Sequence, residues 1–356
     1  MENAVNKIIN SRIEYIDVAK GIGIFLVVYA HVLYNWNWIA MSICSYHMPF
    51  FFLLSGLFAI NKDIKFRDYL LKQFKTLLLP FFVFVVIDYV LQFAAALYTK
   101  TVNLSEFIAN FFLSLSGIKF TVLNGPIWFI FSLFVVKIIY YFIKKNNFLK
   151  IVIGLLCFLF IVFVIFEVIK IDPFLHCLYL ESICGLLFFI VGSYCKPYIK
   201  KTEKVINNHK VISAVILLIL VFAIIKLAKI NGHVSMANCI FGNYISLFIL
   251  DSFIGTAVII IISVLISNMK YFKSIILFFG VNSIIVLLLH DYAIKAVETV
   301  LSRFVNTADL LTNNIWFQTA VTIVVMIIIS IAIPIFNRFF PFIIGKKREK
   351  SIKEQN

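Results

Sequence analysis

Long apolar stretches follow one another along almost the whole of this 356-residue chain. Each has about 20 residues, enough for a helix with a rise of about 1.5 Å per residue to cross a bilayer core of ~30 Å. The pattern predicts an all-α polytopic membrane protein with ten transmembrane helices, near residues 17–39, 47–60, 74–98, 124–143, 150–168, 176–195, 211–230, 240–267, 274–297 and 315–343. The second stretch is short, so we expect that helix to be tilted or extended into Cys44–His47.

Composition supports the same class. The chain is 62% hydrophobic and 14% charged, whereas about 25% of residues are charged in a soluble domain. A net charge of +15 is compatible with nucleic-acid binding, but the cations gather in the short segments between the apolar stretches. We therefore expect the lipid bilayer, and no nucleic acid, as a partner.

The distribution of cations predicts the orientation. Of the 32 Lys and Arg residues, 24 lie at the N-terminus, in alternate loops or in the C-terminal tail, seven lie on the opposite side, and Lys137 lies within a span. Cytoplasmic loops carry the excess of Lys and Arg, so both termini are predicted to be cytoplasmic. We expect one membrane domain over residues 1–345, a basic tail over 346–356, and a multi-pass location in a bacterial inner membrane or a plasma membrane.

The sequence shows little sign of a cysteine-based metal or redox site, a repeat protein, a nucleotide-binding protein or a secreted protein. The six cysteines show no C-x-x-C spacing, and we find no internal repeat or Gly-rich phosphate loop. The first apolar segment contains His31 and lacks a small-residue cleavage pattern, so we do not expect a cleaved signal peptide.

Ionisable residues inside the spans are costly and mark candidate functional positions. Each can also simply satisfy a neighbouring backbone group or cap a helix. We favour that second interpretation for Asp88, Asp251 and His176, and leave both open for Glu181. The remaining candidates are His31, His47 and His290.

Lys20 and His31 form the most informative pair. They are eleven residues apart on one apolar segment, or about 16–17 Å along a helix. If Lys20 lies at the cytoplasmic headgroups, His31 is expected near the middle of the hydrocarbon. A neutral imidazole is abundant at pH 7 and can accept a proton from a hydroxyl, either as a general base or on the way to a covalent intermediate.

Four local patterns together resemble a known family. They are D-x-x-K-G-I followed by a histidine (Asp17, Lys20, His31), H-M-P-F-F-F-L-L-S-G (His47 to Gly56), N-G-P-I-W-F-I (Asn124 to Ile130) and N-S-I-I-V-L-L-L-H (Asn282 to His290). In this order, within a ten-span frame, they resemble the integral-membrane acyltransferase-3 family and, within it, the fucose 4-O-acetylase-like group.

The resemblance implies transfer of an acetyl group from cytoplasmic acetyl-CoA, the acyl donor, to a hydroxyl of a cell-surface glycan or its lipid-linked saccharide precursor. It makes His31 the catalytic residue and associates Lys20, in the same motif as Asp17, with the CoA end. Lys20 stands where many members have Arg, and Gln73-Phe74-Lys75 replaces the usual R-x-R. This leaves Arg67, Lys72 and Lys75 as the expected CoA contacts. The usual excess of Lys and Arg in cytoplasmic loops also explains the positive charge of this loop by itself.

Further residues are assigned by their place in these motifs. Ser55 is expected to orient the imidazole or the thioester, whereas Gly56 is expected to let another helix approach. On the acceptor side we expect substrate contacts from the motif residues Asn124, Trp128, His47 and His290, and also from Glu181, which lies outside the four motifs. Metal binding by His47, His176 and His290 is disfavoured because they lack i, i+3 or i, i+4 spacing, so no metal is expected.

The sequence therefore predicts a membrane O-acetyltransferase. A transporter or flippase is the main alternative, because carriers are also helical bundles with ionisable residues near the membrane midplane. A sensor or non-catalytic scaffold of the same fold is a second alternative, disfavoured by the presence of both His31 and Lys20.

Overall fold

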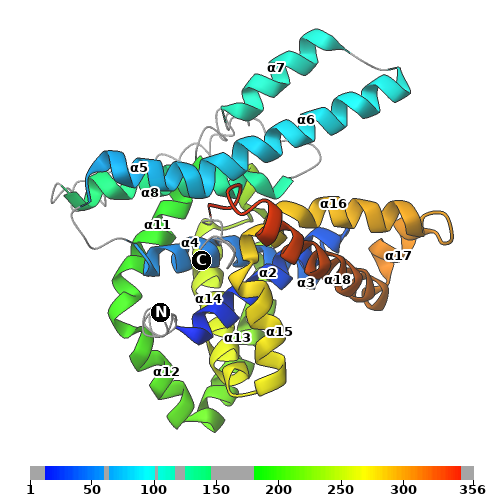
Figure 1. The fold of residues 1–356 in the computed structure, drawn as a ribbon. Coiled ribbons are helices and arrows are strands. Elements are labelled where there is room, and N and C mark those ends of the chain that lie inside the picture. The colour runs from blue at the N-terminus through cyan, green and yellow to red at the C-terminus, as the bar shows by residue number, and fades with distance from the viewer. Residues whose placement is uncertain (1–12, 60–63, 101–102, 117–124, 146–179, 346–356) are drawn as a thin grey trace, which may run out of the picture. The chain divides into compact units, whose positions relative to one another are not determined.

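The computed structural model describes residues 13–59, 64–100, 103–116, 125–145 and 180–345. This part of the chain is almost entirely helical (Figure 1), with one short antiparallel ribbon in which Val234 pairs with Phe241. The chain divides into two compact units. Unit 1 comprises Met1–Phe58, Gly192–Met236 and Ile240–Ser330, and unit 2 comprises Ala59–Val191, Ala237–Cys239 and Ile331–Asn356.

Unit 1 holds most of the described helices. They are α2 (Glu14–Val32), α3 (Trp38–Cys44), α4 (His47–Leu57), α12 (Ile199–Asn208), α13 (Lys210–Asn231), α14 (Ile245–Ser267), α15 (Lys270–Val281), α16 (Ser283–Leu301), α17 (Thr307–Asn313) and the larger part of α18 (Ile315–Phe339), with strands β1 (Val234–Ser235) and β2 (Ile240–Phe241). Unit 2 holds α5 (Phe66–Gln73), a π-helical turn (Phe74–Leu78), α6 (Leu79–Thr99), α7 (Leu104–Leu115), α8 (Trp128–Lys145) and most of α11 (Leu180–Cys195).

Eight helical segments of the described residues are long and apolar enough to cross a membrane, and α15 and α16 pass the same test only as a pair, which is bent by 83° and so forms either a broken span or a re-entrant loop. They match nine of the ten predicted spans, while the predicted span 150–168 lies outside the described residues. The short second span is extended further than expected, because α3 and α4 together form one segment from Trp38 to Leu57. The chain is a multi-pass, all-α membrane protein.

The predicted C-terminal boundary of the first span is wrong. Helix α2 ends at Val32, and Asn37 begins α3 by accepting hydrogen bonds on its side-chain oxygen from the backbone N–H groups of Ile39 and Ala40. Asparagine is a favourable N-cap, so a new helix starts where the apolar pattern suggested that the old one continued. His31 therefore lies in the last turn of α2 and not near the middle of a helix reaching residue 39.

Two glycines let α15 lie directly against α2. A Cβ on Gly280 would be 1.8 Å from the carbonyl oxygen of Asp17, and a Cβ on Gly21 would be 2.1 Å from that of Ile276. Just beyond Gly280 the chain bends by 83° at Asn282, whose amide donates to the Phe278 carbonyl at 2.9 Å. This side-chain bond satisfies a carbonyl group in the last turn of α15, and beyond the bend α16 packs along α2.

Substituting Gly280 by Ala is expected to destabilise the protein by about 1–3 kcal/mol, because the added methyl group meets backbone that cannot move aside cheaply. Thermal unfolding of the protein in detergent, followed by tryptophan fluorescence, measures the effect. Ser274→Ala on the same helix is the matched control, since the Ser274 hydroxyl bonds within its own helix to the Lys270 carbonyl. Equal unfolding temperatures for the two variants would show that the close approach is absent.

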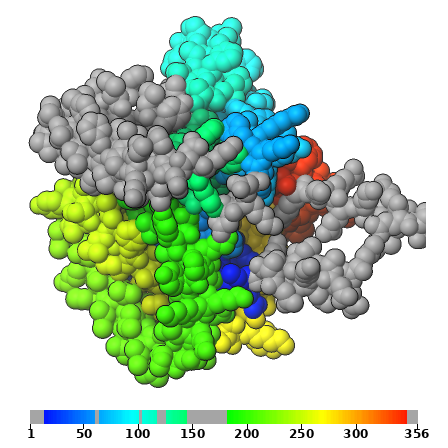
Figure 2. All heavy atoms as spheres, turned by 90° about the vertical axis from the view of Figure 1, so that its left-hand side faces the viewer, coloured from blue at the N-terminus to red at the C-terminus, as the bar shows by residue number. Residues whose placement is uncertain are grey.

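Helix α13 presents apolar side chains outward. Large hydrophobic side chains are exposed along its length, and only 17% of its most apolar 18-residue stretch is buried. Figure 2 shows α12 and α13, in green and yellow-green, on the outside of one face. Hydrophobic residues on all sides of such a helix are typical of a segment surrounded by lipid.

Candidate functional site

The C-terminal end of α2 and the middle of α16 bring three ionisable residues together, here called the His31 cluster: His31, His290 and Asp291. His290 lies seven residues beyond the start of α16, or about 10 Å along that helix. Helices α2 and α16 pack side by side, so the bend at Asn282 is what carries His290 to His31.

The geometry of the His31 cluster is compact. Asp291 Oδ1 lies 3.5 Å from His31 Nδ1 and 3.5 Å from His290 Nε2. The two imidazole rings meet edge to face with centroids 5.0 Å apart. The His31 side chain is 37% exposed, that of Asp291 is 12% exposed, and that of His290 is fully buried. His31 is thus the member that a substrate can reach.

The hydrogen bonds of His290 fix its tautomer. Its Nδ1 lies 2.9 Å from the Leu287 carbonyl oxygen and 3.1 Å from that of Val286. A carbonyl oxygen only accepts, so Nδ1 carries the proton and Nε2 of the neutral ring has a free lone pair. Within the described residues Nε2 is buried and has no hydrogen-bond partner.

Other polar groups surround His31. His47, which was predicted from its motif, is buried at the start of α4, with Nδ1 2.9 Å from the Ile43 carbonyl oxygen. His47 and Lys295 both lie close enough to His31 to interact with it electrostatically. Tyr34 lies in the loop after α2, where partial burial and a hydrogen bond to Glu298 raise the pKa of its hydroxyl. His31 is therefore in a polar environment at the end of an apolar helix.

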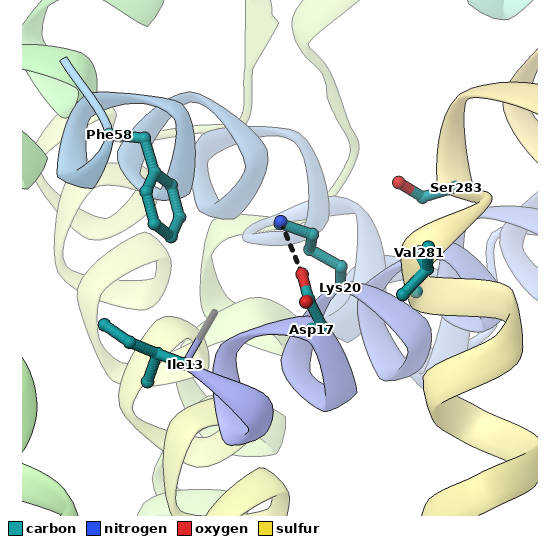
Figure 3. A pocket seen from close by; sticks show the side chains of 7 residues that line it. Ile13, Asp17, Lys20, Phe58, Val281 and Ser283 are labelled. Atoms are coloured by element: carbon teal, nitrogen blue, oxygen red, sulfur yellow. Dashed lines mark hydrogen bonds and ion pairs between the residues drawn. The ribbon is translucent and has the colours of Figure 1, made fainter. Parts of the chain in front are cut away.

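The other end of the same two helices encloses a pocket of about 380 Å³, here called the Lys20 pocket. Figure 3 shows Lys20 and Asp17 from α2, Phe58 from the end of α4, and Val281 and Ser283 from either side of the bend. Lys20 Nζ donates to Asp17 Oδ1 at 2.7 Å and lies 5.1 Å from the centre of the Phe58 ring. The motif residues Asp17 and Lys20 thus form an ion pair, with ammonium protons left to meet a ligand.

Of the two roles expected of Ser55, orienting the His31 imidazole does not agree with its position, whereas orienting the thioester stays a prediction. Ser55 is half-buried in the last turns of α4, eight residues or about 12 Å along that helix from His47. It lies one turn before Phe58, which lines the Lys20 pocket. Its place on α4 is thus nearer the Lys20 end than the His31 end.

The remaining predicted residues belong to unit 2. Arg67, Lys72 and Lys75 are exposed on α5 and the π-helical turn that follows it. Trp128 is only 5% exposed and packs edge to face against Phe129, so it does not present an open face. Glu181 is buried in the first turn of α11, and Asn124 lies outside the described residues.

Two acidic residues were misjudged from the sequence. Asp291 was not among the predicted site residues. The signal that could have found it is its place directly after His290 in an apolar span, because an acidic residue there is costly. Asp251 was expected to bond a neighbouring backbone group or cap a helix. It is instead fully buried inside α14, and neither carboxylate oxygen has a hydrogen-bond partner among the described residues.

The His31 cluster is also the group of described residues whose ligand atoms could hold a metal ion, since one atom from each lies within 4.8 Å of the others. The metal site that we considered and disfavoured from the sequence combined His290 with His47 and His176 instead of with His31 and Asp291. His176 lies outside the described residues.

Comparison with protein families matches residues 13–334 to the acyltransferase-3 family, described as an acyltransferase domain. The matched range contains α2, α16 and every residue of the His31 cluster and the Lys20 pocket. Comparisons with curated proteins and with solved structures found no match.

Proposed function

Because the chain belongs to the acyltransferase-3 family, we propose that it transfers an acetyl group from cytoplasmic acetyl-CoA to a hydroxyl of a cell-surface glycan or its lipid-linked precursor. We further propose that it acts in the cell membrane of a bacterium, as a member of the fucose 4-O-acetylase-like group. The observation that carries the proposal is the accessible imidazole of His31 with the Asp291 carboxylate at its Nδ1.

This arrangement suits a general base. With the Nδ1 proton directed at Asp291, Nε2 of His31 has a lone pair that takes the proton of an acceptor hydroxyl. The hydroxyl oxygen then bonds to the thioester carbonyl carbon, the carbon–sulfur bond breaks, and the CoA thiolate takes the proton from His31. The negative charge of Asp291 stabilises the imidazolium that forms between these steps.

The Lys20 pocket is the proposed place for the donor. Its volume lies within the range of about 300–1,000 Å³ that is usual for small-molecule sites. Lys20 offers a cation for a phosphate or the thioester oxygen, and Phe58 and Val281 offer an apolar surface for a thin alkyl arm. Since eleven residues of α2 separate Lys20 from His31, the extended pantetheine arm is proposed to follow α2 and α16 toward His31.

The acceptor is proposed to bind at the opposite end. The loop and helix start that follow His31 carry three partly exposed aromatic side chains, Tyr34 (51%), Trp36 (45%) and Trp38 (46%). The Trp36 ring lies 3.7 Å, centre to centre, from that of His233, which holds it in place. Aromatic faces beside polar groups suit a saccharide, and this loop supports the proposal better than the buried Trp128.

Isotope transfer tests the proposal. In inside-out vesicles that contain the acceptor glycan or its lipid precursor, acetyl-CoA labelled in its acetyl group is expected to label the saccharide fraction. The label should be released by mild base, as an ester is. Vesicles from cells without the protein are the control. Absence of label in the saccharide fraction, with the protein present and folded, would contradict O-acetyl transfer.

Replacing Arg67, Lys72 and Lys75 together by Gln is expected to raise the KM for acetyl-CoA several-fold and to change kcat less. Contacts to the CoA phosphates persist from ground state to transition state, and these side chains are exposed and screened by salt. Steady-state kinetics in reconstituted membranes measure both constants.

The matched control replaces Lys200, Lys201 and Lys204, which are exposed on α12. It removes the same number of charges from another segment that is predicted to be cytoplasmic. Equal KM values in the two triple variants would assign the cations of α5 to topology alone.

A further inference from the structure

The buried Nε2 of His290 is the feature that the proposed reaction does not use. This nitrogen lies 3.5 Å from Asp291 Oδ1, and Nδ1 of the His31 ring lies 3.5 Å from the same oxygen. When His290 is neutral, a nitrogen lone pair and a carboxylate oxygen face each other, and the two repel unless a positive group lies between them.

The distances match those of a metal site. Bonds of about 2.0–2.1 Å from a tetrahedral zinc ion place neighbouring ligand atoms about 3.3–3.4 Å apart. Both contacts of Asp291 Oδ1 are 3.5 Å, and the third pair of ligand atoms lies within 4.8 Å. A small movement of the accessible His31 ring therefore completes the site, while the other two ligands stay where they are.

The outer contacts of His290 are those of a ligating histidine. Its Nδ1–H is directed at the Leu287 and Val286 carbonyl oxygens, which orients the ring and leaves Nε2 for the metal. Two imidazoles and one carboxylate are a donor set that zinc accepts, with a fourth position left open.

We propose that His31 Nδ1, His290 Nε2 and Asp291 Oδ1 bind one divalent zinc-like ion, and that this ion reversibly inhibits acyl transfer. The inhibition rests on the proposed function. A metal on Nδ1 of His31 leaves the ring proton on Nε2, so His31 no longer has a lone pair for the proton of the acceptor hydroxyl.

A neighbouring charge supplies a specific test of the site. Lys295 lies one turn beyond Asp291 on α16, close enough to His31 to interact with it electrostatically. A cation beside a metal site repels the metal. Lys295→Gln is therefore expected to bind zinc more tightly than the wild type does, whereas a variant that merely loosens the fold would not gain affinity.

Zinc binding is measured on the purified protein in detergent, without acetyl-CoA, by competition with a colorimetric zinc indicator. The wild type is expected to bind one zinc ion per chain, and Asp291→Asn, His290→Ala and His31→Ala are each expected to bind it at least tenfold more weakly. His209→Ala removes an exposed histidine elsewhere and should bind like the wild type. Thermal unfolding without zinc shows whether the buried His290 variant is folded, and Asp291→Asn, which keeps the side-chain shape, serves if it is not.

Two results would overturn the metal site: no zinc binding by the wild type, or wild-type affinity in both Asp291→Asn and His31→Ala. Stoichiometric binding that leaves acyl transfer unchanged would overturn the inhibition. If the protein transfers no acyl group at all, the zinc measurement still stands by itself, so failure of the proposed function is distinguishable from failure of the site.

Discussion

Replacing His31 by Ala is expected to lower acyl transfer by about 10²–10⁴-fold, because the reaction loses its general base. The side chain lies in the last turn of α2 and is 37% exposed, so its removal leaves no buried cavity. The variant should therefore insert and unfold like the wild type. Release of free CoA by protein in liposomes with acceptor saccharide measures the rate.

His209→Ala is the matched control, since this exposed histidine between α12 and α13 is outside the His31 cluster. It should keep the wild-type rate. A His31→Ala variant that retains more than a tenth of the wild-type rate would remove His31 from the chemistry.

Replacing Asp291 by Asn is expected to lower kcat by about 10²–10⁴-fold while the KM for acetyl-CoA changes little, by analogy with the carboxylate that orients a catalytic histidine. The amide keeps the shape of the carboxylate but removes the charge that stabilises the imidazolium. The amide also no longer selects the His31 tautomer that carries its proton on Nδ1. Asp291 touches His31 and not the donor pocket, so it acts as a positioning residue.

The split between kcat and KM separates this role from a structural one. Asp309→Asn on α17 changes an exposed carboxylate and should leave both constants unchanged. Asp291→Glu, which restores the charge, should recover part of kcat. A fall in kcat for Asp291→Asn that Asp291→Glu does not reduce would point to a packing role instead.

Local patterns were sufficient to predict much of the fold and one end of the site. Spans are dictated by apolar length, so eight of them are found close to their predicted places among the described residues, and a ninth predicted span corresponds to the bent pair α15–α16. Asp17 and Lys20 are i, i+3 neighbours on one helix, and their ion pair follows from helical geometry. His31 and His290 were each predicted from their motifs.

Long-range contacts were not predictable from those patterns. The sequence does not show that Gly280 abuts Asp17, or that the chain bends by 83° at Asn282, and both facts bring Asp291 to His31. The end of α2 at Val32 was hidden because Leu33, Tyr34, Trp36 and Trp38 continue the apolar and aromatic pattern around two asparagines. The side-chain cap from Asn37 decides that boundary.

The central claim is tested most directly by the O-acetyl content of the surface glycan, isolated from cells and measured by NMR. Cells that make the wild-type protein should contain acetyl esters on the glycan, and cells that make His31→Ala at the same membrane level should contain none. Wild-type ester content in the His31→Ala cells would contradict the mechanism. A wild-type glycan without acetyl esters, in cells where the protein moves a solute across the membrane, would instead identify a carrier.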